Sequence, residues 1–218
     1  MVTVAHDATA MLPLIQARRS SEQTHMIYDC EMVWMEAKQD ANDCMIIATS
    51  FDILEGEKKK EIAFPKPLGG GTEVEIQHWI QDFRFGTEHI DDFACDCWAT
   101  NVTDEGFTAN ASGSSIAERL DVTWIVYKKG KRKVAGGSFG TDDVEDRAEN
   151  AAQNTGRVEF PEGQFDKPPT VLAGLSQFEL AGARDLAIGV YVEDVDAKGF
   201  TWHLSMLSAL LLQCRELD

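Results

Sequence analysis

The sequence predicts an all-β chain of antiparallel β-sandwich modules in tandem, and three observations lead to this expectation. Short apolar runs alternate with polar residues, turn signals separate these runs, and two parts of the chain repeat one another. Alternation with a period of two places one set of side chains on a buried sheet face. Several short strands with regularly spaced turns are typical of a sandwich or barrel.

Two segments carry the clearest strand signals. Residues Glu73 to Phe83 alternate, with Val74, Ile76 and Ile80 on one face. Residues Leu120 to Tyr127 are rich in β-branched and aromatic side chains, which favour strands. We therefore expect both segments to pair within antiparallel sheets.

Glycine-containing polar segments mark the turns between strands. Asp104 to Gly106 and Asp196 to Gly199 each lead directly into a phenylalanine, and both are predicted as turns. Lys128 to Lys133, with Gly130 at its centre, precedes a second apolar run and predicts a hairpin tip exposed to solvent.

The repeats rest on aromatic residues that recur in matching surroundings. Their offsets are 96, 93, 90 and 88 residues, for the pairs Phe64 and Phe160, Phe107 and Phe200, Trp34 and Trp124, and Phe51 and Phe139. Recurrence at a fixed period indicates a repeat architecture. We therefore divide the chain into a partial module in 1–55, a first complete module in 56–141, and a second module in 142–218 that is truncated at its C-terminal end.

A partial module cannot bury its own apolar face. We therefore expect Cys30 to Phe51 to complete a sheet, either with Asp166 to Leu204 of the same chain or with another copy. Helices are expected to be minor, and the segments that favour them are Thr9 to Arg19, Val144 to Gln153 and Leu207 to Asp218.

The charge balance bounds the partners. The chain has 37 acidic and 20 basic residues among 218, for a net charge of -17. Nucleic acids and anionic membranes require a basic face, so we expect neither as a partner. No apolar run is long enough to predict a membrane span. Because Met1 to Met11 lacks the features of a signal peptide, we expect a cytoplasmic protein, an unconventionally secreted one, or an incomplete N-terminus.

The cysteines predict neither a disulfide framework nor a metal site. Five cysteines make an odd count, and Cys95 and Cys97 lack the spacing of zinc ligands. Within a strand these two side chains point to the same face, so we expect buried free thiols. No metal and no cofactor is predicted.

Catalytic motifs are absent from the sequence, which contains no zinc-protease, serine-hydrolase, phosphate-loop or dinucleotide-binding signature. We therefore expect a protein that is not an enzyme. A hydrolase remains an alternative, because Asp91-Asp92 and Asp142-Asp143 offer carboxylate pairs for glycoside hydrolysis.

Three motifs in fixed order carry a family resemblance. They are Asn101-Val-Thr-Asp-Glu-Gly-Phe107, Asp121-Val-Thr-Trp124-Ile-Val-Tyr127 and Phe165-Asp-Lys-Pro-Pro-Thr-Val171. Together with their repeats they cover most of the chain from Cys30 to His203, and this combination resembles the H-type lectin domain.

The resemblance implies a six-stranded antiparallel β-sandwich and a carbohydrate-binding protein for galactose or N-acetylgalactosamine glycans. It also implies homo-oligomers such as trimers, binding without a metal, and a role in recognition or cell adhesion. The alternative is a lectin-like structural or protein-interaction module that has lost sugar binding.

The resemblance also implies an arginine, an acid, and a histidine or polar residue as sugar contacts. Ala94 and Ala187 stand at the arginine's spacing, so Arg184 substitutes only if its strand slips or bulges. The predicted carbohydrate-binding residues are Arg184, Asp146, Trp202 and His203. Core packing explains the other tryptophans better than sugar stacking, and His203 has an alternative role as a satisfied surface or core histidine.

Overall fold

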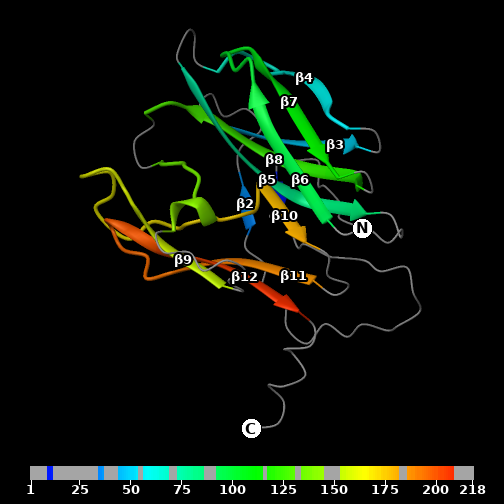
Figure 1. Ribbon diagram of the computed structural model, residues 1–218. Helices are drawn as coiled ribbons and strands as arrows, with labels where there is room; N and C mark the ends of the chain where they lie inside the picture. Colours follow the sequence, from blue (N-terminus) through cyan, green and yellow to red (C-terminus); the bar gives the residue numbers. More distant parts are fainter. Residues whose placement is uncertain are drawn as a thin grey trace. The chain divides into compact units, whose positions relative to one another are not determined.

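The computed structural model describes residues 9–11, 34–36, 44–53, 56–68, 73–85, 92–114, 117–130, 134–144, 153–181 and 186–208 (Figure 1). Strands dominate this part of the chain, and its helical element is one short 3-10 turn, η1 (Thr141–Asp143). The predicted all-β class is confirmed. In the same residues, no helix has the length and apolar character needed to cross a membrane.

The chain divides into two compact units. Unit 1 comprises residues 1–129 together with 176–181, and unit 2 comprises 130–175 together with 182–218. The module boundaries predicted at 55 and 141 stay a prediction.

Unit 1 contains two antiparallel sheets that form a β-sandwich (Figure 1). The three-stranded sheet has the order β3–β8–β5, with bounds Cys44–Asp52, Ala117–Lys128 and Val74–Phe85. The four-stranded sheet has the order β10–β6–β7–β4, with bounds Gln177–Ala181, Asp92–Thr100, Gly106–Gly113 and Lys58–Ala63. The described N-terminal residues pair as a separate two-stranded sheet of β1 (Thr9–Met11) and β2 (Trp34–Glu36).

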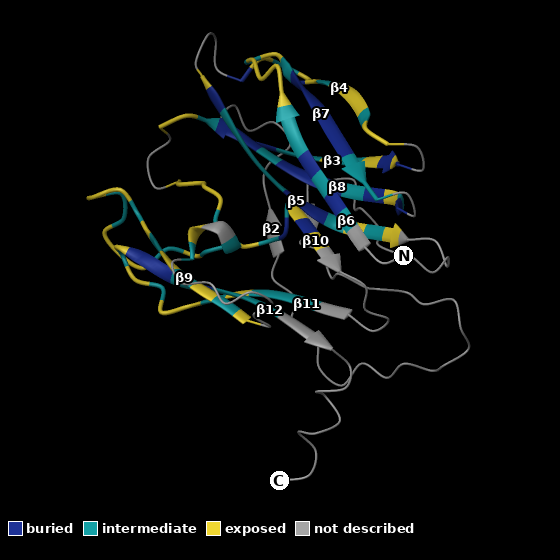
Figure 2. Ribbon diagram, viewed as in Figure 1, coloured by how far each residue is buried: buried dark blue, intermediate teal, exposed yellow. Residues whose placement is uncertain are grey.

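The core of unit 1 lies between its two sheets, where Figure 2 shows the buried residues along the central strands β7 and β8. The Trp124 side chain is fully buried, and its ring centroid lies 5.1 Å from that of Phe107 on the opposite sheet. Cys95 and Cys97 are also buried as free thiols, as predicted. Aromatic and sulfur-containing side chains from both sheets thus hold the sandwich together.

One half-buried histidine packs against this core. The Nε2 atom of His78 lies 2.7 Å from the carbonyl oxygen of Cys97, which can only accept, so Nε2 carries the proton. The ring centroid lies 4.9 Å from that of Trp124, and Nδ1 is buried without a hydrogen-bond partner. Burial therefore lowers the pKa of His78, although the Cys97 carbonyl and the charge of Asp96 act in the opposite direction.

Three expectations about local structure are wrong. Strand β3 pairs with β8 of unit 1 and not with residues 166–204, because Ile47 and Phe51 find apolar partners there. Residues 134–140 form no strand after Gly130, so the predicted hairpin is absent there. Thr9–Met11 is a strand and not the start of a helix, because its backbone pairs with β2.

Unit 2 contains one three-stranded antiparallel sheet in the order β11–β12–β9. Its bounds are Leu186–Glu193, Gly199–Ser208 and Gln153–Glu159. Phe200 and Trp202 of β12 are buried on the inner face. The ring of the loop residue Phe139 stacks on that of Trp202, with centroids 4.9 Å apart and an angle of 19° between the planes. Aromatic side chains therefore cover this face of the sheet.

The β6–β7 and β11–β12 hairpins share one turn geometry. Asn101 and Asp194 both adopt a left-handed conformation, with φ of 51° and 50°. In each turn a backbone N–H two residues later donates to the carbonyl of the glycine that begins the next strand, from Thr103 to Gly106 and from Asp196 to Gly199. The two predicted turns are therefore confirmed, and they match residue by residue at an offset of 93.

The low pKa of His78 predicts acid sensitivity. In the unfolded chain this imidazole takes up a proton near its ordinary pKa of about 6.5. The folded chain keeps it neutral to lower pH, so the free energy of unfolding should fall as pH falls below about 6.5. In His78→Gln this part of the pH dependence should be missing in denaturant titrations between pH 7.5 and 5. If the free energy of unfolding depends on pH in the same way in parent and variant, the neutral imidazole in the folded chain is contradicted.

The packing of Trp202 predicts a steric requirement for Gly156. A Cβ atom at Gly156 would lie 2.6 Å from two carbons of the buried indole, too close for any real contact. Gly156→Ala should therefore lower the free energy of unfolding of unit 2 by about 1–3 kcal/mol. The control is Gly189→Ala, whose Cβ would meet only the Ser205 hydroxyl, which can rotate away. Similar thermal stability of both variants would refute this packing.

Candidate functional site

The outward face of the unit 2 sheet carries polar and aromatic side chains. Strand register places His203 between Tyr191 and Thr155 on the neighbouring strands, and places Thr201 between Glu193 and Arg157 in the same way. These six residues alternate with the buried inner-face residues of the same strands and therefore point outward. We call this set the His203 face.

An exposed aromatic ring lies at the centre of the His203 face. Tyr191 is 42% exposed, which is unusual for a large aromatic side chain. Its ring stacks on the His203 imidazole, with centroids 4.5 Å apart and an angle of 15° between the planes. The imidazole supports Tyr191 from within the sheet, so the ring is held in place at the surface.

The two nitrogens of His203 have different partners. Nδ1 lies 2.9 Å from the hydroxyl of Thr155, in hydrogen-bond contact. Nε2 lies 3.4 Å from a carboxylate oxygen of Glu193 and makes no hydrogen bond. The short contact and the missing hydrogen bond are compatible, because 3.4 Å is within ion-pair distance when the ring is protonated but is too long for a good hydrogen bond. Glu193 is 60% exposed, so its carboxylate remains open to a further donor.

The turn beside this face is fixed by Asp196. One of its carboxylate oxygens accepts from the backbone N–H groups of Lys198 at 2.6 Å and Gly199 at 2.8 Å. Its other oxygen lies 3.2 Å from the Arg157 guanidinium. The backbone N–H of Lys198 makes the largest contribution to lowering the pKa of Asp196, followed by the N–H of Gly199 and by Arg157. The ionised carboxylate therefore holds both the turn and Arg157 in position.

The predicted site residues have different positions. His203 lies in the His203 face. Trp202 is only 2% exposed and points to the opposite face of the sheet, because neighbouring strand residues alternate and the indole packs on Gly156 and Phe139. Arg184 and Asp146 lie outside the described residues.

Sequence reasoning missed Tyr191, Glu193 and Thr155. A signal for two of them was present, because pairing residues outward from the turn at Asp196 to Gly199 places Tyr191 opposite His203 and Glu193 opposite Thr201. Thr155 could not be found in this way, since β9 is distant in sequence and its register depends on the folded sheet.

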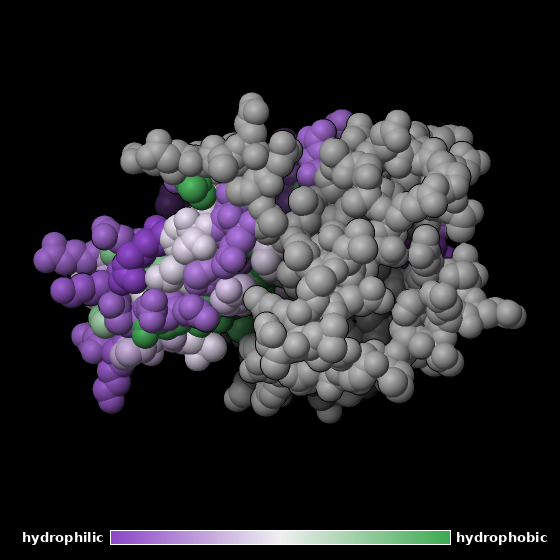
Figure 3. Space-filling view, turned by 60° about the horizontal axis from the view of Figure 1, so that its bottom comes forward, coloured by the Kyte–Doolittle hydropathy of each residue, from purple (hydrophilic) through white to green (hydrophobic). Residues whose placement is uncertain are grey.

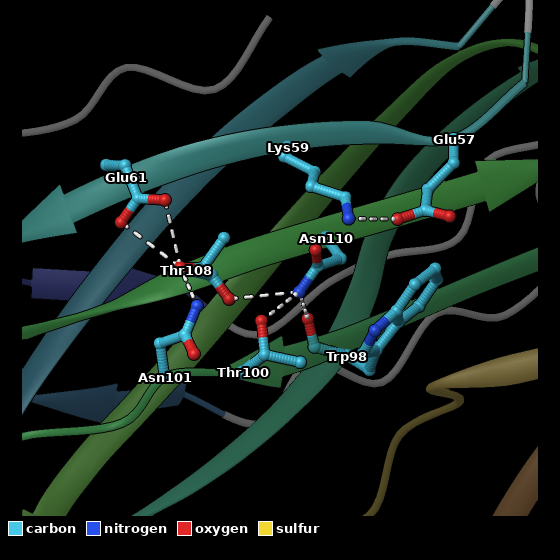
Figure 4. A network of polar contacts seen from close by, with 8 residues as sticks. All are labelled: Glu57, Lys59, Glu61, Trp98, Thr100, Asn101, Thr108 and Asn110. Atoms are coloured by element: carbon cyan, nitrogen blue, oxygen red, sulfur yellow. Dashed lines mark hydrogen bonds and ion pairs between the residues drawn. The ribbon is translucent and has the colours of Figure 1, made fainter.

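The corresponding face of unit 1 is closed by its own hydrogen bonds (Figure 4). At the 93-residue offset, Asn110 corresponds to His203, Trp98 to Tyr191 and Thr100 to Glu193. The buried Asn110 amide nitrogen donates to the Trp98 carbonyl at 3.1 Å, to the Thr100 hydroxyl at 3.0 Å and to the Thr108 carbonyl at 3.1 Å. The asparagine thus uses its donors within the sheet.

Thr108 extends this network across to strand β4. Its hydroxyl donates to the Glu61 carboxylate, at 2.9 and 3.1 Å to the two oxygens, and accepts from the Asn101 amide at 3.1 Å. Lys59 forms an ion pair with Glu57 at 2.9 Å on the same strand and the loop before it. The polar groups drawn in Figure 4 are therefore largely satisfied by one another.

No group of three or more histidine, cysteine or acidic side chains within the described ranges has the arrangement of a metal site. Figure 3 shows one face of the molecule, where the described surface is mainly hydrophilic and hydrophobic residues form small separate areas. The chemistry available at the His203 face is hydrogen bonding by carboxylate and hydroxyl groups around one exposed ring.

Comparison with known families gives one match. Residues 155–210 match the model of the H-type lectin domain, and this segment contains strands β11 and β12 and most of β9. No curated protein matches the chain. The matched segment includes all six residues of the His203 face, and it indicates a carbohydrate-binding, lectin-type module. The resemblance drawn from the sequence is thereby confirmed for residues 155–210, the part of the chain that is similar to the H-type lectin domain.

Proposed function

We propose that this protein is a lectin that binds glycans through the His203 face. The observation that supports this most is an exposed, immobilised tyrosine ring beside an open carboxylate, within the segment that matches the lectin domain. Sugars present hydroxyl groups around an apolar ring face. They are therefore recognised by charged hydrogen-bonding groups together with an aromatic platform.

Each side chain of the face has a role in this proposal. The Tyr191 ring packs on the apolar face of a sugar, and the Glu193 carboxylate accepts hydrogen bonds from its hydroxyls. The exposed Thr155 presents its hydroxyl as a further polar group, and a hydrogen bond with His203 Nδ1 holds this hydroxyl in place. The buried Trp202 acts as a positioning residue, because it fixes β12 from the inner side.

The proposed ligands are glycans of the galactose or N-acetylgalactosamine type, bound without a metal or another cofactor. Arg184 and Asp146 are proposed as additional contacts, since a guanidinium fork can donate to two hydroxyls and a carboxylate can accept from a third. The proposed role is recognition or cell adhesion, and no catalytic step is involved.

A shallow face with one aromatic ring gives weak binding per site. Linked sites raise the overall affinity by roughly a hundredfold or more when they engage together. We therefore propose that the protein acts as a homo-oligomer, with the trimer implied by the resemblance as the expected form.

The second candidate function, a structural or protein-interaction module without sugar binding, is favoured for unit 1. The hydrogen bonds of Asn110 and Thr108 occupy the groups that a sugar would need at the corresponding face (Figure 4). We propose that unit 1 is silent toward glycans and that unit 2 carries the binding activity.

Retention on immobilised N-acetylgalactosamine, with a chelator present, tests the proposed face. The parent protein should be retained and then eluted by free sugar. Glu193→Gln should weaken retention about tenfold, because a hydrogen bond to a charged group contributes about 1.5–3 kcal/mol. Tyr191→Ala should weaken it by a similar amount through lost ring contact.

Matched controls are Glu179→Gln and Trp98→Ala in unit 1, which should leave retention unchanged. Arg184→Ala tests the additional contact, and unchanged retention would remove this residue from the site. If the parent is not retained on this sugar or on galactose, the interaction-module function replaces the proposed one.

A further prediction separates stability from binding in unit 1. Asn110→Ala removes the hydrogen bonds that the buried amide donates to the Trp98 carbonyl, the Thr100 hydroxyl and the Thr108 carbonyl, so the free energy of unfolding should fall by about 1–3 kcal/mol. Sugar retention at a temperature where the variant is folded should equal that of the parent. Ser112→Ala, on the same face of the same strand, is the control and should change neither quantity. Loss of retention in Asn110→Ala would place a sugar contact in unit 1.

A further inference from the structure

Strand β10 belongs to unit 1 although the chain on both sides of it belongs to unit 2. Residues 176–181 group with unit 1, whereas 130–175 and 182–218 form unit 2. β10 pairs with the edge of β6 over five residue pairs, from Gln177 opposite Asp96 to Ala181 opposite Asp92. The four-stranded sheet of unit 1 is therefore completed by a strand that arrives from the later part of the chain.

Side-chain packing and backbone hydrogen bonds hold this strand at the β6 edge. Phe178 is only 8% exposed, and its ring centroid lies 5.2 Å from that of Phe83. The carbonyl of Ser176, just before the strand, accepts from the backbone N–H of Cys97 at 3.2 Å and from its thiol at 3.3 Å. The edge of β6 is thus a strand-accepting site with a defined register and a buried position for an aromatic residue.

A single connection joins the first continuous part of unit 1, which ends at residue 129, to the rest of the chain. All residues up to 129 lie in unit 1, and β10 together with unit 2 lies within residues 130–218. At this point Gly130 has a φ of 71°, and Val134 to Ser138 are exposed and form no helix or strand. A second chain could therefore supply the whole of 130–218 without breaking any other strand pairing among the described residues of unit 1.

We propose that the β6 edge is an interaction surface for β10 of a second copy of this chain, reached by reciprocal exchange of residues 130–218. The contacts at the edge are the same whether β10 comes from the same chain or from another. The balance is then set by the connecting segment and by protein concentration, as in other exchanges of an identical element between protomers. An edge strand left without its partner is reactive toward pairing, which drives the exchange once β10 has detached.

Cross-strand disulfides between two differently marked chains test this proposal. Glu179 of β10 pairs directly with Ala94 of β6, where opposing Cβ atoms are about 4.5–5.5 Å apart, close to the range that a disulfide spans. Ala94→Cys is placed in one chain and Glu179→Cys in another chain of different mass. The native Cys95 interferes little, because burial raises the pKa of its thiol to about 12 and keeps it in the unreactive thiol form.

The two chains are mixed, unfolded, refolded together over a range of concentrations and then oxidised. We expect a two-chain product joined between residues 94 and 179, identified by mass spectrometry, and its share should rise with concentration. Ala94→Cys mixed with Glu159→Cys, an exposed residue of β9, is the control and should not give this product. Phe178→Asp in the donor chain should abolish the product, because it removes the buried ring.

A single chain carrying both Ala94→Cys and Glu179→Cys calibrates the experiment. It should form the internal disulfide at low concentration, which checks the register. If this chain closes but the mixture gives no two-chain product at any concentration, β10 stays with its own chain and the proposal is overturned. If the single chain does not close, the strand-accepting edge itself is refuted. Neither outcome depends on sugar binding, so the proposed function is tested separately.

Discussion

The register of the β11–β12 hairpin is the constraint on which the His203 face depends. A slip of one residue would move every side chain of β12 to the other face, so that Trp202 would face solvent and His203 the aromatic cluster. The ionised Asp196 prevents this by accepting two backbone N–H groups of the turn, while Asp194 adopts the left-handed conformation that the turn requires. The polar His203 face on one side of the sheet and the aromatic packing on the other therefore depend on a single turn.

On the inner faces of the two units, corresponding positions of similar hairpins carry side chains of different size. In unit 1, Ala109 pairs with Lys60, and the space in front of Phe107 is filled by Trp124 from the second sheet. In unit 2 the corresponding pair is Trp202 with Gly156, so β12 itself supplies the large ring and its neighbour has no side chain. A larger side chain at one position of such a pair requires a smaller one at the other, because a well-packed interior tolerates neither an overlap nor a void.

Local patterns predicted local structure well, while partners distant in sequence could not be predicted. Alternation and turn residues were sufficient for β5, β8 and the two turns, since these depend on nearest neighbours and on strand periodicity. The same alternation, counted from Phe200, would have placed Trp202 on the buried face. The sequence contains no such signal for the pairing of β10 with β6, because the β10 sequence fits any antiparallel edge. Only the folded sheet determines which edge it pairs with.

The central polar residue differs between the corresponding faces of the two units, and so do its contacts. The two amide hydrogens of Asn110 are shared among three acceptors of its own sheet, two backbone carbonyls and a hydroxyl, so the amide nitrogen has little left to donate to a ligand. A histidine is longer and planar, and its two nitrogens point in fixed, divergent directions. His203 therefore contacts only Thr155 with one nitrogen, while its ring supports Tyr191 at the surface. Glu193, which approaches the other nitrogen without a hydrogen bond, keeps its acceptor capacity. The two faces therefore differ at this central position and also where Trp98 corresponds to Tyr191 and Thr100 to Glu193. In unit 1 the polar groups bond to one another, whereas in unit 2 Tyr191 and Glu193 stay exposed.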